Sequence, residues 1–269
     1  MFTTAIILPY IDPIALNIGF INIHWYGLSY LCGILLGWLY LKSKFVSSCT
    51  GDNKSMILSL SDLIPWIVFG ILLGGRVGYV LIYNPIYFIG NPIEIFRVWN
   101  GGMSFHGGLL GIIIAIYFYS KKNKKSFLAF MDLIAISAPI GIFFGRLSNF
   151  INTELIGTYS DLPWSVIYAN DSVSRHPSQI YEALLEGLIL FLILAYLSKR
   201  NKILHNKGMA SAIFLVTYGA FRIFLEQFRL PDQQIGYIFT DWLTMGMIIS
   251  IPMILVGLIL YKNIQKKDE

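Results

Sequence analysis

Polar side chains able to hold an anion gather in the stretch GRLSNFINTELIG (145–157). Arg146, Asn149, Asn152 and Glu154 lie within nine positions, directly after an apolar run without charge. Ionisable groups at membrane depth are costly and are functional candidates by default. The guanidinium fork of arginine matches the geometry of phosphate or carboxylate. The alternative from these residues alone is a helix end with a snorkelled arginine and ordinary capping groups.

A second cluster, WNGGMSFHGGLLG (99–111), places His106 among glycines. Histidine is the side chain best suited to move a proton near neutral pH. Glycine lets a backbone approach a ligand closely or adopt a positive φ angle. Two interpretations stay open here, a structural histidine in a glycine-rich segment and a proton-transfer group.

A third cluster, YGAFRIFLEQFRLPD (218–232), carries Tyr218, Arg222 and Glu226 at intervals of four residues. This spacing puts the three side chains along one face of a helix, where the arginine and the glutamate can pair. Such a buried pair either serves architecture alone or fixes Arg222 so that its remaining donors face an anionic substrate.

Three smaller features complete the polar inventory. HWYG places Tyr26 at the start of an apolar run, where tyrosine is a common interfacial anchor. RHPSQIYEALLEG (175–187) carries Glu182 and Glu186 on one helix face, where they either line the interior or pair with Arg76. For Arg76 itself, inside the apolar run that contains GGRVGY, we predict a structural partner.

The composition identifies the elements that must position these residues. Hydrophobic residues make up 56% of the 269-residue chain and charged residues 13%, against about 25% charged residues in soluble domains. We predict an all-α, polytopic membrane protein with seven transmembrane helices and a single integral-membrane domain over 1–269. The N-terminus lacks the basic region of a signal peptide. The predicted spans, each near the 20 residues that a membrane requires, are 18–41, 60–83, 103–119, 127–148, 178–198, 209–228 and 237–261.

Lysine-rich segments follow the first, third, fifth and seventh predicted spans, and the positive-inside rule places them in the cytoplasm. The N-terminus is then outside, the C-terminus is cytoplasmic, and 151–177 is an extracytoplasmic loop. The isoelectric point near 9.1 therefore reflects topology, and nucleic acid is not an expected partner. The basic residues of these segments are Lys42, Lys44, Lys54, Lys121, Lys122, Lys124, Lys125, Lys199, Arg200, Lys202, Lys207, Lys262, Lys266 and Lys267.

Glycines four residues apart predict close packing of helix backbones. They are Gly33 with Gly37, Gly70 with Gly74 and Gly78, Gly107 with Gly111, and Gly141 with Gly145. The chain lacks the HExxH, GxSxG and GxxxxGK[ST] motifs, and its two cysteines lack metal-ligand spacing. No metal site is predicted. If the protein is an enzyme, its nucleophile is expected to come from a substrate.

These clusters together resemble the prolipoprotein diacylglyceryl transferase family. GRLSNFINTELIG matches the family pattern G-R-x-x-N-F-x-N-x-E-x-x-G at every fixed position. HWYG, GGMSFHGG, RHPSQIYEALLEG and YGAFRIFLEQFRLPD match further family blocks in the same order, so the resemblance covers about residues 15–260.

The resemblance implies a seven-helix enzyme of the bacterial plasma (inner) membrane with its active site near the outer leaflet. Such enzymes transfer the diacylglyceryl group of phosphatidylglycerol to the lipobox cysteine thiol of preprolipoproteins. A thioether forms and glycerol phosphate leaves, which is the first step of lipoprotein maturation. The implied partners are phosphatidylglycerol, the lipobox region and the bilayer, and no metal or organic cofactor is implied.

On this resemblance, Arg146 and Arg222 are expected to hold the phosphate, and His106 is the expected base, with Tyr26 assisting. Asn149, Glu154 and Glu226 are expected to orient these groups. Gly157 is expected to permit the turn after Glu154, and Tyr218 to contribute to substrate binding. The alternative from another class is a membrane lipid transporter or a lipid-binding scaffold without transferase chemistry. Transporters commonly carry internal repeats, and none is evident here.

Overall fold

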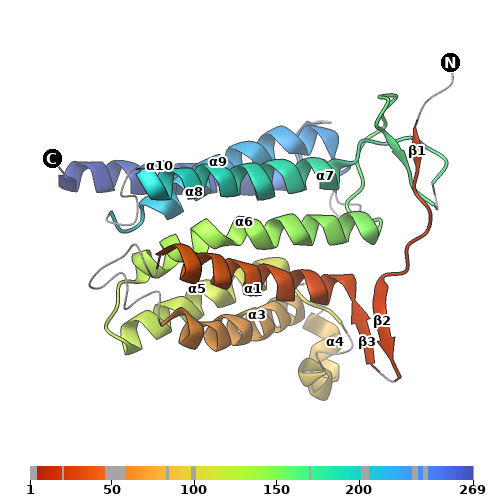
Figure 1. Ribbon diagram of the computed structural model, residues 1–269. Helices are drawn as coiled ribbons and strands as arrows, with labels where there is room; N and C mark the ends of the chain where they lie inside the picture. The colour runs from red at the N-terminus through yellow and green to blue at the C-terminus, as the bar shows by residue number, and fades with distance from the viewer. Residues whose placement is uncertain are drawn as a thin grey trace. The chain divides into compact units, whose positions relative to one another are not determined.

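The computed structural model describes residues 5–19, 21–45, 59–82, 85–97, 101–169, 171–200, 206–231, 236–238 and 242–268. Helices account for most of these residues, as Figure 1 shows. The chain divides into two compact units, a larger one formed by Met1–Tyr40 with Asp132–Glu269 and a smaller one formed by Leu41–Met131.

The larger unit holds most of the helices and all four described strands. Its helices, two of which extend past its boundary, are α1 (Trp25–Phe45), α6 (Phe127–Ile151), α7 (Ser178–Glu182), the π-helical turn η3 (Ala183–Ile189), α8 (Leu190–Arg200), α9 (Met209–Leu225), the 3-10 turn η4 (Glu226–Phe228) and α10 (Met245–Asp268). Its strands are β1 (Ile6–Ile7), β2 (Ile14–Ile18), β3 (Ile21–His24) and β4 (Val166–Ile167). The smaller unit contains α3 (Leu60–Ile82), α4 (Pro85–Gly90), the 3-10 turn η1 (Pro92–Phe96) and α5 (Phe105–Lys122).

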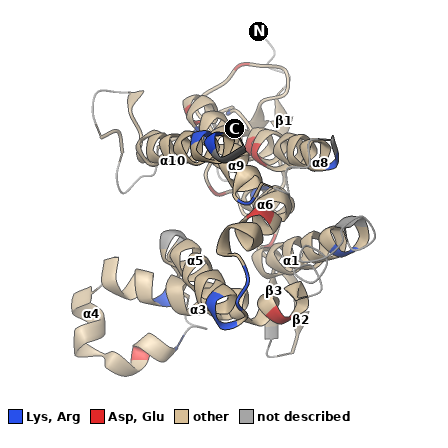
Figure 2. Cartoon of the chain, turned by 90° about the vertical axis from the view of Figure 1, so that its left-hand side faces the viewer, with Lys and Arg blue, Asp and Glu red and all other residues tan. Residues whose placement is uncertain are grey.

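Among the described residues, five helical segments are long and apolar enough to cross a membrane, so the chain is a mostly helical, multi-pass membrane protein. They correspond to five of the seven predicted spans. The other two predictions, over 18–41 and 103–119, fall on α1 and α5, and the count of seven stays a prediction. The five segments are Leu60–Ile82, Phe127–Ile151, Ser178–Lys199, Met209–Phe228 and Met245–Lys266. Figure 2 shows that few residues of the helices are charged.

The start of the first predicted span was wrong, because β2 and β3 form an antiparallel hairpin there and the helix begins only at Trp25. Within each of the two strands, the residues alternate between apolar and polar or small side chains, which is the period of a strand. Gly19 turns the chain with a φ angle of +65°. A second pairing, parallel, joins β1 to β4. The described chain is therefore not purely α-helical, and its last long helix begins at Met245 instead of 237.

The glycine spacing of the smaller unit does bring two helix backbones into contact, as predicted. In Figure 1, α3 and α5 run side by side. A Cβ atom added to Gly111 would meet the carbonyl oxygen of Gly70 and lie 2.8 Å from its carbonyl carbon. Gly74 and Gly78 face Gly107 in the same way. Glycine is required at this crossing because the two backbones leave no room for a side chain.

We expect Gly111→Ala to lower the free energy of unfolding by about 1–3 kcal/mol, because the added methyl group must push α3 and α5 apart. Gly108→Ala is the matched control on the same helix, since its Cβ would find ordinary contacts at 3.7 Å from Ile71. Unfolding of both variants in mixed micelles gives the comparison. Equal stability of the two variants would contradict the close crossing.

One acidic residue of the apolar helix α6 caps another helix. The carboxylate of Asp132 is buried and accepts hydrogen bonds from the backbone N–H groups of Gly208 (2.6 Å) and Ser211 (2.8 Å) and from the Ser211 hydroxyl (2.8 Å). Helix α9 begins at Met209, so these donors belong to its first turn and to the residue before it. The first N–H groups of a helix have no partner within that helix. Asp132 of α6 therefore supplies hydrogen-bond acceptors for N–H groups at the start of α9.

Candidate functional site

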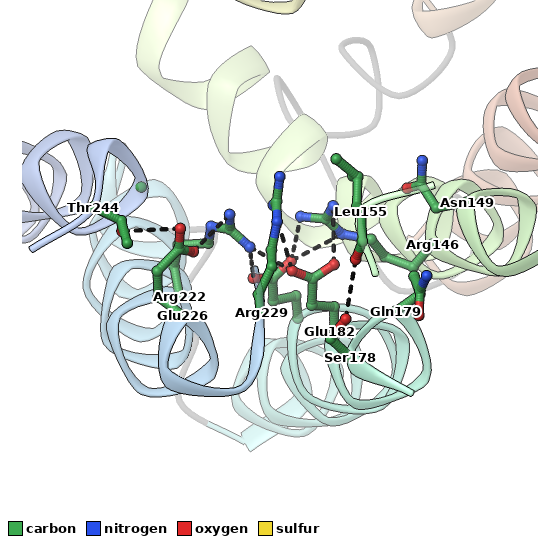
Figure 3. Close-up of polar contacts among 12 residues, drawn as sticks. Arg146, Asn149, Leu155, Ser178, Gln179, Glu182, Arg222, Glu226, Arg229 and Thr244 are labelled. Atoms are coloured by element: carbon green, nitrogen blue, oxygen red, sulfur yellow. Dashed lines mark hydrogen bonds and ion pairs between the residues drawn. The ribbon is translucent and has the colours of Figure 1, made fainter. Parts of the chain in front are cut away.

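A buried cluster of ion pairs lies among α6, α7, η3 and α9 (Figure 3). Glu182 and Glu186 are both fully buried and both face Arg146. The Arg146 Nη1 atom lies 3.1 Å from Glu182 Oε2. Arg146 donates to Glu186 Oε2 from Nη2 at 2.9 Å and from Nε at 3.2 Å. This two-point contact fixes the plane of the guanidinium group.

A second arginine extends the cluster from α9. Arg222 Nη1 donates to Glu182 Oε1 at 2.5 Å, and Arg222 Nη2 lies 2.7 Å from Glu226 Oε2. Thr244 donates its hydroxyl hydrogen to Glu226 at 2.9 Å, which holds the carboxylate from the other side. Arg229 Nη1 reaches Glu182 Oε1 at 3.6 Å. Glu182 is therefore shared by three guanidinium groups.

The local sequence explains how the two central glutamates come to lie side by side. Glu182 ends α7, and Glu186 lies in the π-helical turn η3 that follows it. Residues four apart on a continuous helix share a face, and π turns occur frequently at functional sites. Because no lysine or arginine lies between His176 and Lys199, these buried carboxylates must find positive partners on other helices.

The formal charges of the cluster cancel, since three arginines face three glutamates. Removing one partner of a buried pair leaves an uncompensated charge and is strongly destabilising. Arg146 donates two of its five N–H groups to Glu186, its Nη1 atom lies beside Glu182, and its side chain is 15% exposed. The arrangement can therefore hold a guanidinium group in a fixed direction while donors remain for an incoming anion.

A second polar group joins α1 to the end of α6. The Tyr26 hydroxyl donates to Glu154 Oε2 at 2.6 Å, and the Asn149 amide donates to the Tyr26 hydroxyl. The same amide lies 3.4 Å from Glu154 Oε2. Tyr26, which is more than 120 residues away in sequence, thus forms one hydrogen-bonded group with Asn149 and Glu154, and all three were predicted for the site.

The backbone around Glu154 adopts an uncommon conformation. Thr153 and Leu155 have φ angles of +58° and +56°, values that residues other than glycine rarely adopt. The start of α7 holds this segment, because Gln179 donates to the Glu154 carbonyl at 2.6 Å. Ser178 donates to the Leu155 carbonyl at 3.0 Å, as Figure 3 shows. Backbone strain of this kind persists only where the surroundings fix it, and it clusters at functional sites.

The structure gives Gly157 a different role from the predicted turn. Its φ angle is not positive; instead, a Cβ atom there would collide with the carbonyl oxygens of His176 and Phe228. Gly157 pairs with Arg229 in an isolated bridge, so three backbone segments meet at this residue. One of these segments leads into α7 and another follows α9. Gly157 therefore lets the loop approach the two elements that carry Glu182 and Arg222.

Gly157→Ala is expected to lower the free energy of unfolding by about 1–3 kcal/mol through the forced separation of these segments. Gly145 supplies a matched control from the same thirteen-residue stretch, because nothing lies within 4 Å of a Cβ added there. Thermal unfolding of Gly157→Ala and Gly145→Ala in detergent makes the comparison. A Gly157→Ala protein as stable as Gly145→Ala would contradict the close backbone packing.

The loop between α6 and α7 contains three titratable groups with shifted pKa values. Burial raises the pKa of Tyr168 to about 12, so its hydroxyl stays protonated and donates to Gln179 at 2.9 Å. A hydrogen bond from Arg175 lowers the pKa of Asp171, so the carboxylate stays ionised in their ion pair. Burial lowers the pKa of His176, whose ring packs against Tyr181 and Phe228. These groups order the loop that reaches Gly157.

The other predicted site residues have separate outcomes. Tyr218 stacks on Phe214 one turn before Arg222. His106 lies in the first turn of α5, within the smaller unit, and its side chain falls outside the described part of the structure. Among the described residues, no group of three or more His, Cys, Asp or Glu side chains is placed to hold a metal ion.

Several residues of the cluster were absent from the predicted site. The suggestion that Glu182 or Glu186 pairs with Arg76 was wrong, because Arg76 donates to backbone carbonyls of its own unit. The useful signal was the presence of two glutamates in an apolar helix without a nearby cation, which requires partners elsewhere. The residues missed were Ser178, Gln179, Glu182, Glu186, Arg229 and Thr244.

Comparison with known proteins assigns the family. The family model described as prolipoprotein diacylglyceryl transferase matches residues 13–262. A protein of Rhizobium meliloti (strain 1021), named phosphatidylglycerol--prolipoprotein diacylglyceryl transferase, is 46% identical over 95% of this chain and 94% of its own length. Proteins of the same name from Rickettsia felis (strain ATCC VR-1525 / URRWXCal2) and Rickettsia typhi (strain ATCC VR-144 / Wilmington) are 50% and 48% identical. They cover 93% and 97% of this chain, and 95% and 100% of their own lengths. The chain therefore belongs to the prolipoprotein diacylglyceryl transferase family.

Proposed function

We propose that this protein transfers the diacylglyceryl group of phosphatidylglycerol to the lipobox cysteine of preprolipoproteins in a bacterial plasma (inner) membrane. The cysteine sulfur attacks the glycerol carbon that bears the phosphate. A carbon–sulfur bond forms and the carbon–oxygen bond to the phosphate breaks. The thiol proton passes to a base, and glycerol phosphate leaves with the bonding electrons.

The observation that carries this proposal is the pair of arginines, Arg146 and Arg222, bridged by one buried glutamate, Glu182. Negative charge grows on the phosphate as the carbon–oxygen bond breaks, and preorganised cations stabilise that charge best where water is excluded. The carboxylates of Glu182, Glu186 and Glu226 keep the two forks oriented before the lipid arrives. Arginine suits this role because its planar fork binds phosphate through two bonds.

The attacking thiol must lose its proton, since the thiolate is the nucleophile and a free cysteine has a pKa of about 8.5. We assign His106 as the base that accepts this proton. The hydrogen-bonded group of Tyr26, Asn149 and Glu154 has a supporting role. In this group Tyr26 is oriented by a carboxylate and an amide. That arrangement fixes the direction of its hydroxyl group.

The proposed orientation follows from the lysine-rich segments. Seven spans with the N-terminus outside and the C-terminus in the cytoplasm put 121–125 and 262–267 on the cytoplasmic side. Arg146 and Glu154 lie at the opposite end of α6 from 121–125. The site is then near the outer leaflet, where 151–177 meets both lipid and the secreted preprolipoprotein.

The test is to incubate the purified protein with phosphatidylglycerol and a lipobox peptide without any gradient. Peptide mass and released glycerol phosphate are followed together. A diacylglyceryl mass gain with equal glycerol phosphate release is expected, and a peptide with serine in place of the cysteine should give neither. Lipid binding without either product, from folded protein and a competent peptide, would favour a lipid transporter or binding scaffold and overturn the proposal.

A further inference from the structure

One arginine of the smaller unit directs all five of its N–H groups to backbone carbonyls. Arg76 lies in α3 and is 5% exposed. Its Nε donates to Ile95 at 2.9 Å, and its Nη2 donates to Glu94 at 2.5 Å and to Arg97 at 3.2 Å. Five donors are the full capacity of a guanidinium group.

The other two bonds connect Arg76 to the segment that leads into α5. Nη1 donates to the carbonyls of Gly101 at 2.5 Å and Gly102 at 3.1 Å. Both glycines have positive φ angles, +82° and +77°, and a Cβ on Gly102 would collide with the ring of Tyr79. The fork of Arg76 therefore joins the end of η1 to the glycine turn before α5. The point charge of a lysine cannot span both segments at once.

Ser104, the second residue after this turn, is fixed from the same side. The Ser104 N–H donates to the carbonyl of Gly75 at 2.8 Å, the residue directly before Arg76. The Ser104 hydroxyl caps α5 by accepting a hydrogen bond from the N–H of Gly107 at 3.2 Å. The backbone of His106 lies between these two points, in the first turn of the helix. Residues 75 and 76 thus fix the start of the helix that carries the proposed base.

We propose that Arg76 is a positioning residue for diacylglyceryl transfer, which acts by holding the start of α5 so that His106 meets the thiol proton of the substrate. This inference rests on the proposed function of His106. Proton transfer requires hydrogen-bond reach between base and proton. A displacement of about 1 Å in a catalytic group can cost about 100-fold in rate.

Arg76→Lys tests the proposal, because it keeps the charge but cannot reach both segments. At pH 7 we expect transfer to slow by about tenfold or more, with the KM for phosphatidylglycerol changed by less than about twofold. At about pH 9.5 most thiol is already thiolate, so the loss should shrink to less than about twofold. A purely structural defect would give the same loss at both pH values, and that result would overturn the proposal.

Two further variants complete the test. Ser104→Ala perturbs the start of α5 more gently, so the same pH-dependent loss, of smaller size, is expected even if Arg76→Lys folds poorly. Arg97→Ala is the matched control, since its side chain is 47% exposed and pairs with Glu94 on the surface. Its transfer rate should equal that of the unmodified protein at both pH values. A Ser104→Ala loss that is equal at both pH values would also overturn the proposal.

His106→Gln separates this inference from the proposed function. A full rate for His106→Gln at pH 7 would remove histidine as the base, and the positioning role of Arg76 would fail with it, whereas the transferase function itself would stand. A pH-dependent loss in His106→Gln without one in Arg76→Lys or Ser104→Ala would leave the base in place and refute the positioning role alone.

Discussion

Arg146→Ala is expected to lower the rate of diacylglyceryl transfer by about 100- to 1000-fold, the usual effect of removing one preorganised electrostatic donor from an active site. In the free protein, Arg146 is already held by Glu182 and Glu186, so its orientation needs no rearrangement when the lipid binds. Arg146→Lys should recover little of the rate, because an ammonium group cannot keep the two-point contact with Glu186.

Arg97→Ala serves as the control for this measurement, because it removes a half-exposed arginine whose ion pair with Glu94 lies at the surface. Rates are measured from peptide mass at saturating phosphatidylglycerol, with folding checked by thermal unfolding. If Arg146→Ala transferred the lipid within about threefold of the Arg97→Ala rate, the phosphate could not depend on Arg146.

Glu182→Ala is expected to lower the free energy of unfolding by about 3–5 kcal/mol, since it removes a fully buried carboxylate that is shared by three guanidinium groups. Arg146, Arg222 and Arg229 would then face one another with too few counter-charges. Unfolding in mixed micelles with increasing denaturing detergent measures the change.

Glu94→Ala is the corresponding surface variant, in which the carboxylate lost is paired with the half-exposed Arg97. Its expected cost is about 0–1 kcal/mol. Glu182→Gln should fall between the two glutamate-to-alanine variants, because glutamine keeps the volume and one acceptor but loses the charge. A Glu182→Ala protein as stable as Glu94→Ala would show that the cluster does not depend on its shared carboxylate.

The membrane-spanning helices and one helix contact could be predicted from local pattern. Long apolar runs located the five segments that can span a membrane, because the bilayer sets a minimum length for each. The glycines of α3 and α5 predicted their own close contact for a similarly local reason. The alternating pattern of the hairpin Ile14–His24 is also visible in the sequence. The predicted span 18–41 nevertheless included part of the hairpin, because its apolar residues lead directly into the apolar residues of α1.

The site was predictable in part. Arg146, Asn149 and Glu154 form one short stretch, and the Arg222–Glu226 pair lies one turn apart, so both were visible in sequence. The partners of Arg146 lie about 40 residues away, and no local pattern specifies which helix face meets which. Gly157 illustrates the same limit, because its need for glycine arises from two distant carbonyl groups rather than from its own turn.

If the arginine cluster binds the phosphate of the lipid, the lipid must stabilise the folded protein through that contact. A ligand at 100 times its dissociation constant raises the free energy of unfolding by about 2.7 kcal/mol. Short-chain phosphatidylglycerol should therefore raise the unfolding midpoint of the unmodified protein and of Arg97→Ala, whereas diacylglycerol of the same chain length should not. Arg146→Ala should lose most of the rise. An equal rise in Arg146→Ala, or an equal rise with diacylglycerol, would contradict phosphate binding by this cluster.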